Sequence, residues 1–197
     1  MAEFHQLLEY LEKHPSFKLD YCKDSMNVNG LAGYLFAGYC DADWETSDRR
    51  RSITCNIFLY NGAPIQCQDQ WKSKLQESVA LSTAEAEYYS ASLGAAEVIY
   101  LRQLLRDMGF EPKSRTPVYE DNTVCIKWTN NVIGGRERAK HIGIRKHFAH
   151  EAAQLGHLRL HRVPTTVTDQ LADVFAKTLQ PKQHAACIAR ILRRGEM

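Results

Sequence analysis

The feature that most constrains the fold is a change from strand-like to helical spacing of apolar residues in the first half of the chain. Residues 34–44 are mostly aromatic or small, and residues 52–60 form a second strand-like run. Asn61 and Gly62 are the dipeptide that most often closes a tight hairpin, so a third strand is expected over about 63–73. Three consecutive strands joined by short turns predict an antiparallel meander.

Helical spacing follows this meander. Ser82 and Glu85 fit a capping box, in which the serine accepts a hydrogen bond from a free backbone N–H and the glutamate caps in return. A long helix is predicted from this box to about Met108, and Gly109 ends it.

The second half of the chain alternates short strands and helices. Strands are expected over 116–120 and 157–163. Four helices are expected. The first ends near 130, and the others cover 140–155, 168–179 and 181–194. Antiparallel strands first and helix-linked strands later predict a mixed α/β sheet.

A helix, a strand and a linker are predicted ahead of the meander. Apolar residues within 4–11 share one helix face, and residues 17–21 alternate like a strand. Residues 22–33 are polar and contain Gly and Asn, which is typical of a linker. The main domain is therefore expected to begin near Gly33.

Length and composition narrow the class of protein. A chain of 197 residues with 44% hydrophobic and 24% charged residues predicts one globular domain and excludes the disordered, collagen-like and fibrous classes. The net charge of +2 is too small to name a partner. Cations gather in 49–51 and again in 136–146, although a charged run is as often a solvated face.

The six cysteines show no paired spacing of a zinc site or a disulfide framework. We also expect no secretory leader, and no apolar run reaches the ~20 residues that span a bilayer. These features predict reduced thiols in a cytosolic or nuclear compartment and no membrane anchor.

Glu87 lies where a carboxylate is costly. One face of the long helix is predicted to be buried, because small and apolar residues recur on it every three or four positions, at Ala91, Gly94, Val98, Leu101 and Leu105. One further step of this spacing toward the N-terminus reaches Glu87. Glu85 lies off this face and already has a capping role, so Glu87 is the better functional candidate.

Three aspartates share this character. Asp41 interrupts an apolar strand, and Asp43 points to the same face because strand side chains alternate. Asp121 follows the carboxyl end of a strand, where ligand sites of α/β sheets collect. Asp173 is expected in the second turn of a helix, near its positive end.

Each of these acids alone is more often a cap, a turn residue or a surface charge. Four carboxylates together cannot all ionise without a compensating cation, and such hard oxygen ligands select Mg²⁺ or Mn²⁺ over zinc. The set of four therefore favours a divalent metal site.

The sequence around these acids resembles the ribonuclease H domain of copia-type LTR retrotransposon polyproteins. Similarity covers roughly 34–180, and the helix and strand within 4–21 resemble the tail of the preceding reverse transcriptase. Matching segments occur in the family's order, at 38–44, 50–52, 79–88, 121–122, 140–145, 147–148 and 169–173.

The resemblance implies a ribonuclease H-like fold, a five-stranded mixed sheet of three antiparallel and then two parallel strands, flanked by helices. It also implies three regions. Residues 1–33 would be a reverse transcriptase tail or connection, 34–180 the ribonuclease H domain, and 181–197 a C-terminal amphipathic helix.

The activity implied is hydrolysis of the RNA strand of RNA–DNA hybrids during reverse transcription, leaving 5′-phosphate ends. The catalytic and metal-binding quartet carried over is Asp41, Glu87, Asp121 and Asp173, with two Mg²⁺ ions for which Mn²⁺ can substitute. By similarity, Asp41 would bridge both ions, Glu87 and Asp121 would complete the leaving-group site, and Asp173 would complete the site that carries water.

Partners follow from the same resemblance. They are the hybrid and the reverse transcriptase domain of the same polyprotein, inside cytoplasmic virus-like particles, with no small-molecule cofactor. The 2′-hydroxyl distinguishes RNA, and a basic segment would contact phosphates without selecting sequence. Expected substrate-binding residues are Asp43, Trp44, Asn122, Arg138, Lys140, His141 and Arg145.

Some positions depart from the family pattern. Cys55 and Asn56 replace the usual Gly-Tyr, Gly143 replaces an acid, and about four residues are added over 66–69. The loop 164–168 lacks the histidine that cellular ribonucleases H often place before the last helix. None of these departures touches the quartet.

Three rivals remain open. The first is a catalytically decayed or domesticated ribonuclease H-like module that binds nucleic acid without cutting. The second is a DNA-cutting transposase or integrase of the same fold. The third is an interaction domain, which would leave Glu87 unexplained.

Overall fold

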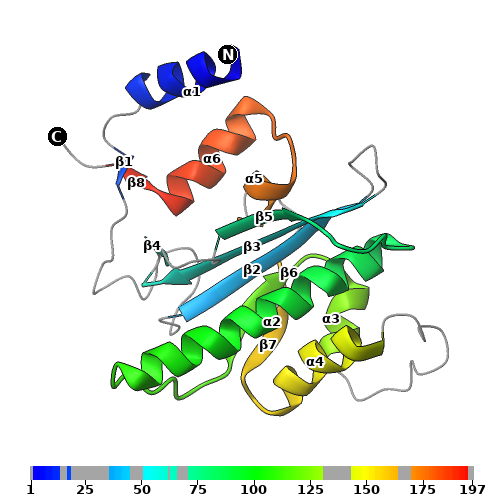
Figure 1. Ribbon diagram of the computed structural model, residues 1–197. Coiled ribbons are helices and arrows are strands. Elements are labelled where there is room, and N and C mark those ends of the chain that lie inside the picture. The colour runs from blue at the N-terminus through cyan, green and yellow to red at the C-terminus, as the bar shows by residue number, and fades with distance from the viewer. Residues whose placement is uncertain are drawn as a thin grey trace.

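A mixed six-stranded sheet forms the centre of the molecule (Figure 1). The computed structural model describes residues 2–13, 17–18, 36–44, 51–61, 63–65, 71–130, 143–163 and 170–194. The strand order is β4-β3-β2-β6-β7, and β5 also pairs with β3.

The first strands form the predicted meander. Strand β2 (Phe36–Asp43) pairs antiparallel with β3 (Ile53–Tyr60) along its whole length. The far edge of β3 carries β4 (Ala63–Pro64) and β5 (Trp71–Leu75), so the expected third strand is present as two pieces. Asn61 adopts a φ of 49°, the left-handed conformation that a tight hairpin turn requires. The extra residues 66–69 lie outside the described part of the chain.

The remaining strands are parallel. Strand β6 (Thr116–Glu120) pairs parallel with β2, and β7 (Leu158–Arg162) pairs parallel with β6. The predicted order of antiparallel and then parallel strands is therefore confirmed. This mixed α/β architecture is consistent with the ribonuclease H-like fold.

One face of the sheet is covered by α2 (Thr83–Asp107), α3 (Thr123–Asn130) and α4 (Gly143–Gln154) (Figure 1). Ser82 caps α2 as predicted, accepting from the Glu85 backbone N–H at 3.2 Å. Gly94 lets α2 approach β2 closely, because a Cβ there would lie 2.4 Å from Cys40 Sγ. Phe58, Val98 and Val118 are buried between these layers.

At the β7 edge of the sheet, a side chain pairs with the backbone of β7. Asn130, the last residue of α3, donates its side-chain amide to the Leu160 carbonyl at 2.7 Å. Its side-chain oxygen accepts from the Leu160 N–H at 3.1 Å. The amide therefore occupies the hydrogen-bonding groups of Leu160 that a neighbouring strand would use.

The other face of the sheet carries α5 (Asp173–Ala176) and α6 (Pro181–Ile191) (Figure 1). Ala176 of α5 and Ile191 of α6 are buried with Tyr39 of β2 in a second apolar cluster. Helix α1 (Ala2–Lys13) contacts this layer, since the rings of Tyr10 and His184 lie 6.0 Å apart.

Two helix ends differ from the prediction. The helix expected over 168–179 is only four residues long, because the backbone at Lys177 is extended (φ −125°, ψ 149°) and its side chain turns back to Asp41. The helix expected to reach 194 ends at Ile191, because β8 (Arg193–Arg194) instead pairs antiparallel with β1 (Phe17–Lys18). Both endings depend on contacts between distant segments, which local sequence does not show.

No described helix is long and apolar enough to cross a membrane.

Candidate metal centre

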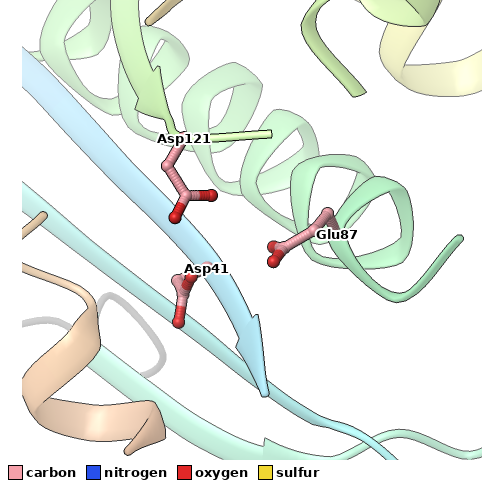
Figure 2. Close-up of side chains that lie close together, drawn as sticks. All are labelled: Asp41, Glu87 and Asp121. Carbon is pink, nitrogen blue, oxygen red and sulfur yellow. The ribbon is translucent and has the colours of Figure 1, made fainter. Parts of the chain in front are cut away.

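Three carboxylates from different elements gather at one point (Figure 2). They are Asp41 of β2, Glu87 of α2 and Asp121, which directly follows β6. One oxygen of each lies within 4.8 Å of the others. Oxygen ligands at this separation could hold a metal ion.

Sheet register explains how two of these residues meet. In the parallel pair of β2 and β6, Tyr39 lies opposite Tyr119. Asp41 and Asp121 each lie two residues further along, so their Cα atoms end up at the same edge of the sheet.

Glu87 comes from the neighbouring helix. It lies in the first turns of α2, whose start is fixed by the Ser82 cap. Ser90, close by on the same helix, donates its hydroxyl to the Asp41 carbonyl at 2.9 Å. This bond joins α2 to β2 beside the site and so fixes the position of Glu87 relative to Asp41.

The cluster is buried. Asp41 is 0% exposed and Glu87 is 4% exposed. Burial raises the pKa of Asp41 to about 7; the ammonium of Lys177 opposes the shift, and Asp173 and Asp121 add to it. Burial, followed by the charges of Glu120 and Asp41, raises the pKa of Glu87 well above its ordinary value. Such a group of acids retains protons unless a cation compensates its charge.

Glu120 is a buried acid that the sequence interpretation missed. It is 0% exposed, and its Oε1 accepts from the Asn122 backbone N–H at 3.0 Å. Neither its Oε2 nor Glu87 Oε2 has a hydrogen-bond partner among the described residues. The missed signal was its place as the last residue of a short apolar strand, directly before the candidate ligand Asp121. Buried, unpartnered carboxylate oxygens fit a cation-binding site.

Asp173 joins the site through a lysine. It is the first residue of α5, not a residue of the second helical turn as predicted, because α5 begins five residues later than expected. The ammonium of Lys177 lies 2.7 Å from Asp173 Oδ1 and 3.1 Å from Asp41 Oδ2. Lys177 was also missed, although its spacing of four residues from Asp173 was visible in the sequence.

The expected substrate-binding residues are only partly described. Asp43 is half-buried at the end of β2, and Trp44, 39% exposed, donates its ring N–H to the Ala80 carbonyl at 3.2 Å. Asn122 caps α3, since its side-chain oxygen accepts from Val124 N at 2.9 Å and from Cys125 N at 3.1 Å.

Most of the basic residues that were expected to bind substrate lie outside the described part of the chain. Arg138, Lys140 and His141 lie outside the described residues, and Arg145 is placed in α4 by its backbone alone.

Fold and site together define an α/β protein whose central sheet carries a buried acidic cluster at the carboxyl ends of two parallel strands. No protein-family model matches the sequence. Among curated proteins, the chain is similar to a segment of the "Retrovirus-related Pol polyprotein from transposon TNT 1-94" of Nicotiana tabacum, with 33% identity over 154 residues, 78% of this chain and 11% of that protein. The corresponding polyprotein from transposon RE1 of Arabidopsis thaliana is 35% identical over 142 residues, 72% of this chain and 9% of that protein.

A relative of another kind is the "Secreted RxLR effector protein 161" of Plasmopara viticola, 33% identical over 97 residues, which are 49% of this chain and 61% of that protein. The chain spans about a tenth of the length of the polyproteins it matches. It is therefore similar to a piece of retroelement Pol polyproteins.

Proposed function

We propose that this chain is a ribonuclease H domain that cuts the RNA strand of RNA–DNA hybrids. The observation that carries the proposal is the meeting of Asp41, Glu87 and Asp121 within 4.8 Å at one edge of the sheet. The fold supports it, and so does the similarity to proteins named retrovirus-related Pol polyproteins.

The residues fit a divalent metal, Mg²⁺ or Mn²⁺. Glu87 and Asp121 would hold one ion with Asp41, and Asp173 would hold a second with the same aspartate. Buried carboxylate oxygens without partners and the all-oxygen donor set suit these ions. When bound, two such ions activate water and stabilise the leaving oxygen of a phosphodiester.

Other residues would bind and orient the substrate. Glu87 could also accept a hydrogen bond from a 2′-hydroxyl, the group by which a protein distinguishes RNA from DNA. The ring of Trp44, three residues after Asp41, is held by its bond to the Ala80 carbonyl and would pack against a sugar of the hybrid. The basic segment over 136–146 would contact phosphates, which position a duplex without reading its sequence.

The proposed setting is a retroelement polyprotein. Residues 1–33 would be the tail of a reverse transcriptase and 34–180 the nuclease domain, with 181–197 as a C-terminal helix. The reverse transcriptase and the hybrid would be its partners, in virus-like particles in the cytoplasm.

The test is cleavage of labelled RNA–DNA hybrid, duplex DNA and duplex RNA, with Mg²⁺, with Mn²⁺ and with chelator. Wild-type protein should cut only the RNA of the hybrid and only with metal. Asp41→Asn should lower the rate at least ~100-fold, because it removes a charge from the centre of the site. Asp107→Asn, an exposed acid at the far end of α2, serves as the matched control and should retain full activity.

A binding module that no longer cuts is the second candidate. The ammonium of Lys177, 3.1 Å from Asp41 Oδ2, favours it, because a lysine in contact with the acidic cluster could compensate its charge in place of a metal ion. Tight binding of the hybrid without cleavage in any metal would support this module and contradict the nuclease.

A further inference from the structure

Lys177 is the cation that the acidic cluster already contains. Its ammonium lies 3.1 Å from both carboxylate oxygens of Asp41 and 2.7 Å from Asp173 Oδ1. Asp41 is fully buried, whereas the lysine side chain is 36% exposed. Within the described residues, Lys177 is the ion-pair partner that the structure gives to Asp41.

The lysine reaches this place because its segment is fixed against β2. Gln170, just ahead of α5, donates its side-chain amide to the Cys40 carbonyl at 2.8 Å. Asp41 shares its strand face with Ala37 and Tyr39, which pack in the apolar cluster that includes Ala172 and Ala176. Asp41 therefore faces α5, and the chain after α5 passes beside its carboxylate.

The ammonium occupies the space between the two carboxylates that were assigned to one metal ion. A Mg²⁺ ion lies ~2.1 Å from its oxygen ligands, so an ion bound to both Asp41 and Asp173 could not share that space with a lysine nitrogen in contact with both. A lysine charge stands on a flexible four-carbon stem, and the partial exposure of this one leaves it a path toward solvent.

We propose that Lys177 is a positioning residue that holds Asp41 and Asp173 together while the site lacks metal and leaves when a divalent ion takes its place. The inference rests on the proposed function, since it assumes that these carboxylates bind metal. Its consequence is that the lysine and the metal compete for the same two side chains.

Lys177→Met tests this competition, because methionine keeps much of the stem and removes the charge. In chelator the variant should unfold at lower denaturant concentration than wild type, because Asp41 and Asp173 are left uncompensated. Its affinity for Mn²⁺ and for Ca²⁺, measured by calorimetry, should rise about tenfold, which lies within the coupling expected of charges in contact. Lys182→Met, an exposed lysine of α6, is the control and should change neither quantity.

A second measurement uses wild-type protein and does not depend on the folding of a variant. Acetylation by an amine reagent, followed residue by residue with mass spectrometry, should be slow at Lys177 in chelator and faster with Ca²⁺ bound. The rate at Lys182 should stay the same in both conditions.

The outcomes separate this inference from the proposed function. Metal binding by wild type, with unchanged or weaker affinity in Lys177→Met or with unchanged acetylation of Lys177, would overturn the competition and leave the nuclease proposal standing. An absence of divalent binding in wild type would overturn both.

Discussion

The carboxyl group of Asp41 is subject to opposing influences within a few ångströms. Burial in the sheet and the neighbouring acids favour its protonated form, while the Lys177 ammonium favours its ionised form. The balance leaves its pKa at about 7, against an ordinary value of 3.8. Asp41 therefore couples the stability of the metal-free protein to pH.

The direction of this coupling can be predicted. Between pH 3.8 and about 7 the folded protein keeps a proton that the unfolded chain has lost, so the free energy of unfolding should fall as pH rises through this window. Glu87 and Glu120, whose pKa values are also raised, act in the same direction. Urea unfolding in chelator at several pH values measures the slope.

Asp41→Asn provides the comparison for this measurement. The variant cannot take up the proton, so its stability should depend less steeply on pH than that of wild type. Identical slopes in the two proteins would show that Asp41 titrates normally in the folded state.

Helix α2 packs closely against β2 at Gly94. Gly94 faces Cys40 of β2, and both residues are buried. The contact fixes the distance between the helix that bears Glu87 and the strand that bears Asp41. Packing at this point should therefore control both stability and the geometry of the acidic cluster.

Gly94→Ala should destabilise the protein, although alanine is usually favoured over glycine in a helix by ~1 kcal/mol. Its Cβ would lie 2.4 Å from Cys40 Sγ, and overpacking of a tight core costs about 1–3 kcal/mol. The net effect in denaturant unfolding should be a loss. Adding Cys40→Ala removes the sulfur and should recover part of it, whereas no recovery would locate the strain elsewhere.

Elements with local signals were predictable from sequence. The Ser82 cap fixed the start of α2, Asn61 marked the hairpin, and the buried face of α2 led to Glu87. The end of α5 and the pairing of β8 were not predictable, because Lys177 and Arg193 take these conformations in response to partners more than a hundred residues away in sequence.

The molecule as a whole places its acidic cluster where four segments meet. Two neighbouring strands bring Asp41 and Asp121 to one edge, and α2 adds Glu87 from one face. From the other face, α5 adds Asp173 and the residue that directly follows the helix, Lys177. Asp41, Glu87 and Asp121 could be named from their places in the sequence pattern and Asp173 from the resemblance, whereas the buried Glu120 was missed. The role of Lys177 as their counter-charge could not be predicted, because it depends on how the segment after α5 packs against β2.

The basic residues within 136–146, proposed to contact phosphates of the hybrid, can be tested by substitution. Changing Arg138, Lys140 and Arg145 to alanine should weaken binding of the hybrid and flatten its dependence on salt. Each lost phosphate contact lowers the slope of log K against log salt by ~0.9, so three contacts lower it by roughly 2–3. Fluorescence anisotropy over a salt series measures the slope. An unchanged slope would remove this segment from the binding surface.

The hydrogen bonds of Asn130 at the edge of the sheet limit how the molecule associates. An unprotected outer strand can recruit strands from other chains and so seed aggregates. At Leu160 the side-chain amide of Asn130 already bonds the backbone N–H and C=O that an added strand would use. An incoming chain would first have to displace these two hydrogen bonds. Self-association by strand addition is thus disfavoured at the midpoint of β7, and one small side chain at a helix terminus provides the protection.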